Sequence, residues 1–429
     1  MAGFGSSQLS RQSISRRSSG PWRLRLLAVF MAILAVAAIV SVFVSERARA
    51  TWGWLADLSD PEIRLGTERT LFGPEIRLPF AVEDRNAVAL TYRVDNDPQE
   101  IPIASPEVVH LTKGLDAGPH AVTIVAVDAA LLSNRAELRV PVEIDQSRPT
   151  VTLKTDPIVW TKQGQLAHLR FVSSEEVETA ADAPYSIIRE PDGGYLLLRP
   201  VPIDEATGMK TDQYELYDRA GNVGVLTQRI QIKPVALRDG TVTLTDALLA
   251  KCGVSTFAEQ ETLREQNYAQ ITQICSVRST PESFSARYQR PSIGEWTSLY
   301  GERRLYNKTS WHRHLAMDIA HLAGAEIVAS GDGTVAYADV LGIYGNCIII
   351  DHGWRIYSLY AHLASLEVAK GDTVKAGQRI ASMGDTGLAG GVHLHYSILV
   401  ANVYVSPDQF LQKMAELAAE KTQPAAENP

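Results

Sequence analysis

Two histidines one residue apart are the first feature of this sequence that could do chemistry. They stand in the stretch Gly-Gly-Val-His-Leu-His-Tyr-Ser-Ile at residues 390–398. In a β-strand, alternate side chains share one face, so His393 and His395 would point one way and their apolar neighbours the other, toward a core. A rigid strand can therefore hold two imidazoles around one small object. The alternative is an exposed polar face that carries two histidines by chance, and this stretch alone leaves both open.

Other histidines cluster in the same part of the chain, because seven of the ten fall between residues 312 and 395. His314 and Asp318 offer a nitrogen and a carboxylate oxygen four residues apart, and both atoms suit zinc. In an extended strand their Cα atoms would lie about 13 Å apart, so we expect the backbone to bend near the small residue Ala316. His362 ends a second strand-like run. His312 mimics half of a histidine pair, but we expect it to be exposed to solvent rather than to bind metal.

Three motifs, taken in this order, carry a resemblance to a known family. They are His-Leu-Ala-Met-Asp-Ile-Ala at 314–320, Tyr-Ala-His-Leu at 360–363 and His-Leu-His-Tyr at 393–396. Together they resemble the signature motifs of the lysostaphin-like, or LytM-domain, zinc endopeptidases that cut peptidoglycan. The similarity covers roughly residues 285–411 and implies an antiparallel β peptidase domain there.

The resemblance implies roles for six residues. The family's zinc ligands match His314, Asp318 and His395. Its two catalytic histidines match His362 and His393, and a tyrosine that helps polarise the scissile carbonyl matches Tyr306. Three protein ligands leave tetrahedral zinc one open position, where a bound water becomes acidic enough to act as a hydroxide nucleophile. A neutral imidazole beside that water can accept and return a proton.

This sequence departs from the family pattern at three positions, and none of them removes a ligand. Ala316 replaces the usual glycine, Val392 replaces a proline before the histidine pair, and Ser397 stands where an acidic residue is common. The first departure could tighten the bend between His314 and Asp318. The last removes one partner that could orient a ligand from behind.

The elements that must position these motifs are mainly β-strands. Short alternating runs separated by turn residues predict two immunoglobulin-like β-sandwiches, at residues 60–145 and 148–234. A helical connector is expected at 242–284, with Thr245 as an N-cap. The peptidase domain follows at 285–411, and a tail rich in Ala, Glu and Pro at 415–429 is expected to be flexible.

The first residues predict attachment to a membrane. A basic tail at 1–25 precedes 19 apolar residues at 26–44. A helix of that length rises about 28 Å, close to the thickness of a bilayer core. The arginines would keep the tail in the cytoplasm and send the C-terminal domains to the periplasmic, or extracytoplasmic, side. Ala-Arg-Ala at 48–50 resembles a signal-peptidase site, so cleavage of this anchor stays an alternative.

Three cysteines suit an oxidising compartment if two of them are bridged. Cys252 and Cys275 flank a helical stretch and are the expected pair, whereas Cys347 lies in a run that predicts a buried strand. The net charge of −8 argues against nucleic acid as a partner.

Two functions of different class remain open at this point. The first is a membrane-anchored zinc endopeptidase that acts on peptidoglycan stem peptides, with the β-sandwiches as spacers or as binding surfaces for cell-wall or division proteins. The second is a non-catalytic module of the same fold that binds the wall or activates another hydrolase. The complete set of three ligands and two histidines favours the enzyme. Zinc is the expected cofactor, and the sequence does not identify the bond that is cut.

Overall fold

The computed structural model describes residues 59–73, 75–84, 86–105, 107–111, 115–129, 133–277 and 287–420. The chain forms two compact units. Of the described residues, the first unit comprises those up to Ser147 together with Arg219–Asn222, and the second comprises Arg148–Asp218 and those from Val223 to Glu420. Most of the described elements are β-strands, so the prediction of a mainly β protein is confirmed.

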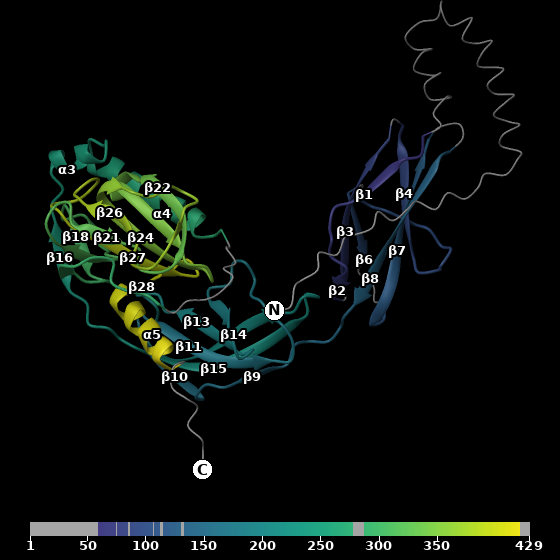
Figure 1. Cartoon of the computed structure of the whole chain (residues 1–429), viewed down its shortest axis with the longest axis horizontal. Helices are drawn as coiled ribbons and strands as arrows, with labels where there is room; N and C mark the ends of the chain where they lie inside the picture. Colours follow the sequence, from purple (N-terminus) through teal and green to yellow (C-terminus); the bar gives the residue numbers. More distant parts are fainter. Residues whose placement is uncertain are drawn as a thin grey trace, which may run out of the picture. The chain divides into compact units, whose positions relative to one another are not determined.

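The first unit contains two sheets that share one apolar core (Figure 1). One sheet has the strand order β1 (Glu62–Leu65), β3 (Ile76–Glu83) and β6 (Val108–Leu111). The other has the order β2 (Leu71–Phe72), β8 (Arg135–Ile144), β7 (Gly118–Asp128), β4 (Val88–Val94) and β5 (Ile101–Pro102). Leu78 and Ile124 are fully buried between the sheets. Exposed and buried side chains alternate along β8, so one face of its sheet is exposed and the opposite face packs against the three-stranded sheet.

The second unit begins with another pair of sheets. The three-stranded sheet has the order β10 (Ile158–Lys162), β15 (Val223–Lys233) and β14 (Gly208–Tyr217). The four-stranded sheet has the order β12 (Ser186–Arg189), β13 (Tyr195–Pro200), β11 (Leu166–Ser173) and β9 (Val151–Leu153). Their inner faces form one core, in which Phe171 stacks on Tyr195 with the ring centroids 5.0 Å apart. We refer to residues 148–233 as the second sandwich.

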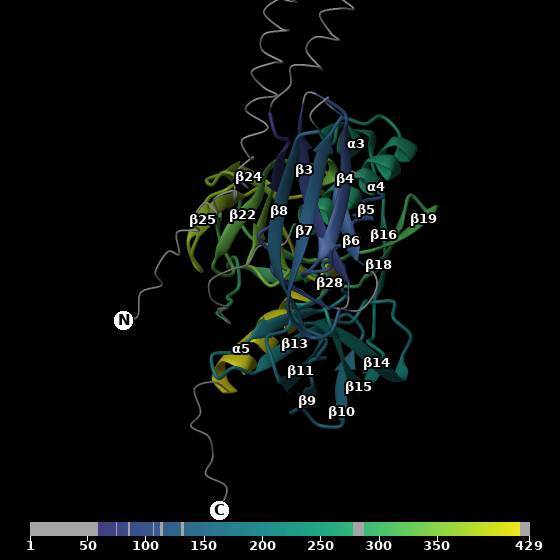
Figure 2. The same ribbon diagram turned by 90° about the vertical axis from the view of Figure 1, so that its right-hand side faces the viewer.

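The four-stranded sheet also uses its other face. Leu166, Ile188, Leu196 and Leu198 belong to the same buried cluster as the C-terminal domain. Helix α5 (Pro407–Glu420) lies against β11 and β13 in both views (Figures 1 and 2), and Gln165 donates to Gln409 at 3.0 Å. The second sandwich and the C-terminal domain therefore share a core.

Helix α5 was not predicted from the sequence, and it runs to Glu420 where a flexible tail was expected from residue 415. Phe410, Met414 and Leu417 recur every three or four residues and are buried. This apolar stripe outweighs the Ala- and Glu-rich composition that suggested a tail.

The helical connector contains α3 (Asp246–Lys251) and α4 (Phe257–Ile274). Thr245 caps α3 as predicted, with its side chain accepting a hydrogen bond from the amide of Leu248. Strand β16 (Asp239–Val242) precedes the helices and pairs with β18 (Arg303–Tyr306), which pairs in turn with β19 (Ser310–Arg313).

The predicted disulfide between Cys252 and Cys275 is wrong, since all three cysteines are free. Cys252 caps the end of α3, before α4 begins, and Cys275 caps the far end of α4. The 18 residues of α4 span about 27 Å, whereas a disulfide needs Cα atoms within about 7 Å. The two cysteines instead line an apolar cluster that also holds Cys347.

The C-terminal domain is built on a ten-stranded sheet. Its main path runs through β17 (Glu295–Ser298), β20 (Met317–Ala320), β27 (Leu394–Val400), β24 (Ile356–Leu366), β23 (Asn346–Asp351), β22 (Gly333–Val340) and β25 (Thr373–Val374). The remaining strands are β21 (Glu326–Val328), β26 (Arg379–Met383) and β28 (Val403–Val405), and a short 3₁₀ turn, η2 (Gly342–Tyr344), precedes β23. Strands β20, β27 and β24, which carry the three sequence motifs, lie side by side in this sheet.

Two predictions fall on residues that the structure does not describe. They are the basic tail at 1–25 and the apolar segment at 26–44 with the adjoining cleavage-like site. Within the described ranges, no helix is both long enough and apolar enough to cross a membrane.

Candidate metal centre

Strand register brings the three sequence motifs together. Asp318 on β20 lies opposite His395 on β27, and Ala361 on β24 lies opposite His395 from the other side. His314 stands in the short segment between β19 and β20, where the chain bends at the fully buried Ala316. The bend brings His314 back toward Asp318, whereas a straight strand would carry the two side chains apart.

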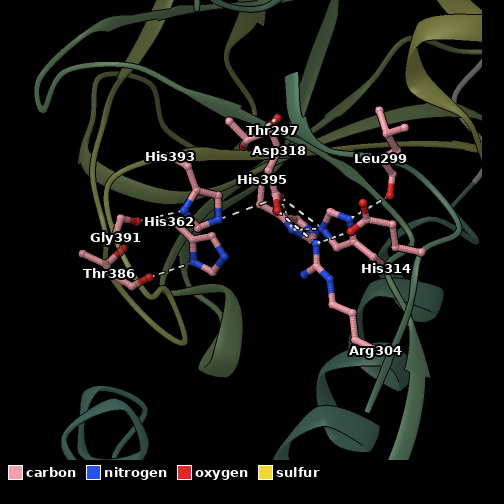
Figure 3. A network of polar contacts seen from close by, with 11 residues as sticks. Thr297, Leu299, Arg304, His314, Asp318, His362, Thr386, Gly391, His393 and His395 are labelled. Carbon is pink, nitrogen blue, oxygen red and sulfur yellow. Dashed lines mark hydrogen bonds and ion pairs between the residues drawn. The ribbon is translucent and has the colours of Figure 1, made fainter. Parts of the chain in front are cut away.

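Three potential ligand atoms converge on one point (Figure 3). His314 Nε2 is 3.1 Å from Asp318 Oδ1 and 3.3 Å from His395 Nδ1, and the latter two atoms are 3.3 Å apart. Zinc bonds of about 2.0–2.1 Å in a tetrahedron require ligand atoms about 3.3 Å apart. Asp318 Oδ1 is buried and accepts no hydrogen bond of good geometry. Two imidazoles and one carboxylate are therefore arranged as zinc requires.

Groups behind the three residues hold them in place. His314 Nδ1 donates to the carbonyl of Leu299 at 3.2 Å, which directs Nε2 toward Asp318 and His395. The second carboxylate oxygen of Asp318, Oδ2, is 3.4 Å from Arg304 Nη2, and Arg304 also reaches Glu302 at 3.2 Å. One oxygen of Asp318 thus faces the imidazoles while the other is held by a half-buried guanidinium (Figure 3).

Two further histidines stand beside the converging atoms. The ring centroid of His362 is 4.8 Å from that of His393 and 5.5 Å from that of His395. His362 Nδ1 donates to the carbonyl of Thr386 and His393 Nδ1 donates to the carbonyl of Gly391, each at 2.8 Å. Because a carbonyl only accepts, both rings carry a proton on Nδ1, and Nε2 is the nitrogen left for the site. His393 Nε2 is 3.8 Å from Asp318 Oδ1.

The backbone of His362 supports a functional role for this residue. Its φ of 62° lies in the left-handed region, which non-glycine residues rarely adopt. Such strain persists where the surrounding structure enforces it, commonly at functional sites.

Comparison with known proteins agrees with this geometry. Residues 312–407 match the sequence model of peptidase family M23. The chain contains an M23 domain. The predicted resemblance to LytM-type peptidases is therefore confirmed.

Several curated relatives match the same region. The chain is 34% identical over 111 residues to the DD-carboxypeptidase/endopeptidase Mpg of Neisseria meningitidis serogroup B, and the match covers 26% of each protein. It is 32% identical over 153 residues to the peptidoglycan DD-endopeptidase ShyA of Vibrio cholerae, covering 33% of this chain and 36% of the relative. It is 38% identical over 137 residues to the murein hydrolase activator NlpD of Salmonella dublin, and the match covers 32% of this chain and 34% of the relative. The chain thus spans between a quarter and about a third of the length of these relatives.

Solved structures give similar matches. A peptidase M23 crystal structure from Pseudomonas aeruginosa is 19% identical, with a TM-score of 0.43, and the match covers 60% of this chain and 96% of that one. The catalytic domain of lysostaphin from Staphylococcus simulans is 26% identical, with a TM-score of 0.26, over 28% of this chain and 92% of that domain.

The charge states in the M23 domain follow from burial. Burial lowers the pKa of His395 to about 4, despite the opposing effect of Asp318. Burial and the neighbouring His395 and His393 hold the pKa of His362 well below its usual range. Burial alone would raise the pKa of Asp318, but His314 and His395 outweigh it, so the pKa lies well below its usual range. At neutral pH the site therefore combines an ionised carboxylate with neutral imidazoles at His395 and His362.

Tyr306 and His312 lie next to the M23 site and contact the connector helix α4. The Tyr306 ring packs under the guanidinium of Arg264 at 4.4 Å and meets the His312 ring at 5.6 Å. His312 Nε2 is 2.6 Å from Glu261 Oε2, so this histidine pairs with α4 where the sequence suggested exposure to solvent. The role of Tyr306 in polarising a carbonyl stays a prediction.

Sequence reasoning missed the groups that support these side chains. No role was predicted for Arg304, and the carbonyls of Thr386 and Gly391 carry no residue-type signal. For Arg304 a signal did exist. Alternate residues of one strand share a face, and Arg304 stands two residues before Tyr306 on β18, so the position predicted for Tyr306 also placed Arg304 on the face toward the site.

Proposed function

We propose that this protein is a zinc-dependent endopeptidase that hydrolyses peptide cross-links of bacterial peptidoglycan. The observation that carries the proposal is the geometry of five side chains. His314, Asp318 and His395 direct three ligand atoms to one point, and His362 and His393 leave their Nε2 atoms available beside it. A structural zinc site would use four protein ligands, whereas three ligands with free bases nearby suit catalysis. The relative named as a peptidoglycan DD-endopeptidase supports the substrate class.

His314, Asp318 and His395 would hold the zinc. Bound zinc would supply a Lewis acid that polarises the scissile carbonyl and makes a water molecule acidic. The low pKa of Asp318 keeps its carboxylate ionised and able to bind a cation across neutral pH. The neutral imidazole of His362 would accept the proton that the attacking water loses. His393, on the same side of the site, would stabilise charge on the substrate or deliver a proton to the departing amine.

We favour a bond between two D-configured centres, such as D-alanine to diaminopimelate, as the one that is cut. Two relatives have names that contain DD-endopeptidase or DD-carboxypeptidase/endopeptidase, which supports this choice. The sequence shows no module typical of enzymes that target glycine bridges.

A non-catalytic role is the competing proposal. The name of the Salmonella relative, murein hydrolase activator, supports it. An activator has no need of bound zinc, so metal content separates the two proposals more directly than fold does.

The purified chain should contain about one zinc per molecule and release cross-linked peptides from purified peptidoglycan. Chelation should abolish release, and added zinc should restore it. His321→Ala is a matched control, because His321 is exposed and lies outside the ligand and base set. Equal activity before and after removal of the metal would contradict the metalloenzyme proposal, and a metal-free, inactive chain would favour the activator.

We also propose that residues 26–44 anchor the protein in the cytoplasmic membrane and that the following domains are periplasmic. The two pairs of sheets at 60–145 and 148–234 are then proposed to be immunoglobulin-like spacers that also offer surfaces to cell-wall or division proteins. Fractionation of cells that express the full chain or a chain lacking 26–44 tests the anchor. Recovery of both forms in the membrane fraction would contradict it.

A further inference from the structure

One loop supports both histidines that we assign to proton transfer. It comprises residues 384–393, between β26 and β27. The loop supplies the Thr386 carbonyl that accepts from His362 and the Gly391 carbonyl that accepts from His393 (Figure 3). These two contacts select the tautomer and aim Nε2 into the site. The position of this loop therefore decides where both bases point.

The first half of the loop is held firmly from within the M23 domain. Thr386 Oγ1 donates to the carbonyl of Leu363 at 2.8 Å and accepts from the amide of Asn346 at 3.0 Å. The amide of Leu388 donates to the carbonyl of Ile343 at 2.8 Å. The carbonyl that orients His362 is thus part of a well-bonded segment.

The second half of the loop is packed more loosely. Gly390 and Gly391 are exposed, and a Cβ atom added to either would meet nothing within 4 Å. Glycines in open space leave the backbone many conformations, and this segment is fixed at its far end by the amide of His393, which donates to the carbonyl of Gly384 at 3.1 Å. The Gly391 carbonyl lies just before that fixed point. That carbonyl is the one that orients His393.

Support comes from the connector helix α3. Lys251, the last residue of α3, places Nζ 3.2 Å from the carbonyl of Ala389, 3.1 Å from the carbonyl of Asp385 and 2.7 Å from Asp385 Oδ2. One ammonium group thereby joins Asp385, near the start of the loop, to Ala389 in its middle. Cys252, the next residue, packs in the same apolar cluster as Leu388, which holds the end of α3 against the loop. Lys251 lies outside residues 312–407, the part of the chain that matches family M23.

We propose that Lys251 is a positioning residue for His393. Its ammonium group holds Ala389 and Asp385, and so keeps the Gly391 carbonyl where it orients the His393 ring. The helical connector is then part of the working enzyme rather than a passive link between domains. This inference rests on the proposed function for its kinetic consequences, but its structural consequence can be measured without activity.

Lys251→Ala in the full chain should lower kcat by about 5- to 10-fold and leave KM within about twofold, because small misplacements of a catalytic group act on the chemical step. Zinc content should not change, since no ligand is touched. Lys251→Arg, which keeps a cationic donor, should recover most of the loss. Lys375→Ala is the matched control, because Lys375 makes an exposed ion pair with Asp332 at 3.2 Å and should have no effect.

A double-mutant cycle tests whether Lys251 acts through His393. Adding Lys251→Ala to His393→Ala should cause no further loss, whereas adding it to His362→Ala should cause the full 5- to 10-fold loss. Equal additional losses in both backgrounds would show a general structural effect and overturn the proposal.

Hydrogen exchange provides the readout that needs no activity. In Lys251→Ala the amides of residues 389–393 should exchange faster than in the parent, while those of residues 386–388 should be unchanged. Unchanged exchange at 389–393 would overturn the proposal even in an active enzyme. Faster exchange there in a zinc-loaded chain without hydrolytic activity would support the loop contact and count against the proposed function instead.

Discussion

The second sandwich and the M23 domain bury charged groups in opposite ways. In the sandwich, Arg199 Nη2 donates to Glu205 at 2.6 Å and Nε donates to Asp212 at 2.9 Å, and Lys210 donates to Glu205 at 2.7 Å. Each charge there has an opposite charge within hydrogen-bond distance. In the M23 domain, Asp318 Oδ1 faces the nitrogens of His314 and His395 without a good hydrogen bond.

This difference separates a site that stabilises the fold from a site prepared for a ligand. A buried carboxylate paired with arginine is complete in the folded chain. A buried carboxylate oxygen that faces two imidazoles, as Asp318 Oδ1 does, gains its stabilisation when a cation binds between them, even though Arg304 holds the other oxygen. The following predictions test this distinction, from the largest expected effect to the smallest.

Removal of a ligand should have the largest effect. His395→Ala leaves two protein ligands, which hold zinc far more weakly, so both metal and activity should be lost. Metal analysis after dialysis, together with peptide release from peptidoglycan, measures this. A fully loaded His395→Ala enzyme would reverse the ligand assignment.

Removal of a base should spare the metal. His393→Ala and His362→Ala should keep nearly one zinc per chain and lose about 10²-fold or more in turnover, the usual scale for a positioned acid–base group. The contrast between metal content and turnover is the informative result. Wild-type turnover in both variants would remove these histidines from the mechanism.

These roles could be predicted from the sequence because they depend on local spacing and residue type. A strand period of two separates His393 from His395, and a four-residue spacing joins His314 to Asp318. The sequence could not predict hydrogen bonds between segments that are far apart in the chain, whether they use backbone carbonyls or a lysine ammonium group. The Thr386 and Gly391 carbonyls are examples, as is the Lys251 ammonium 134 residues from Asp385. The disulfide prediction failed for a different reason: the helix between the two cysteines was expected, but its length of about 27 Å, which keeps their Cα atoms apart, was not taken into account.

Two arginines provide the next test of the comparison. Arg304→Met should lower zinc affinity about 10- to 100-fold, the range found when a group that orients a ligand is removed, with little change in stability. Arg199→Met should leave zinc affinity unchanged and cost about 2 kcal/mol of unfolding free energy, because the half-buried Glu205 and Asp212 lose their ion-pair partner. Competition with a zinc-binding dye and denaturant unfolding measure the two quantities. A zinc-affinity loss for Arg199→Met as large as that for Arg304→Met would contradict the separation of roles.

The smallest effect concerns a histidine of the M23 domain that lies outside the site. His352 is buried, with Nδ1 donating to the carbonyl of Asp332 at 2.8 Å and Nε2 accepting from Ser358 at 2.7 Å. Burial lowers the pKa of His352 to about 4. The unfolded chain, with a pKa near the ordinary 6.5, therefore binds more protons than the folded chain between these values, so stability falls as pH falls.

Between pH 7.5 and pH 5 this single group should cost about 2 kcal/mol of unfolding free energy. His352→Gln keeps a donor and an acceptor but cannot titrate, so the metal-free variant should show a shallower decline than the metal-free parent over that range. Denaturant unfolding at several pH values measures both slopes. His168 in the second sandwich is only half-buried, and burial again lowers its pKa, so His168→Gln should change the slope in the same direction by a smaller amount. Parallel slopes for the parent and His352→Gln would show that His352 is not kept neutral by burial in the folded chain.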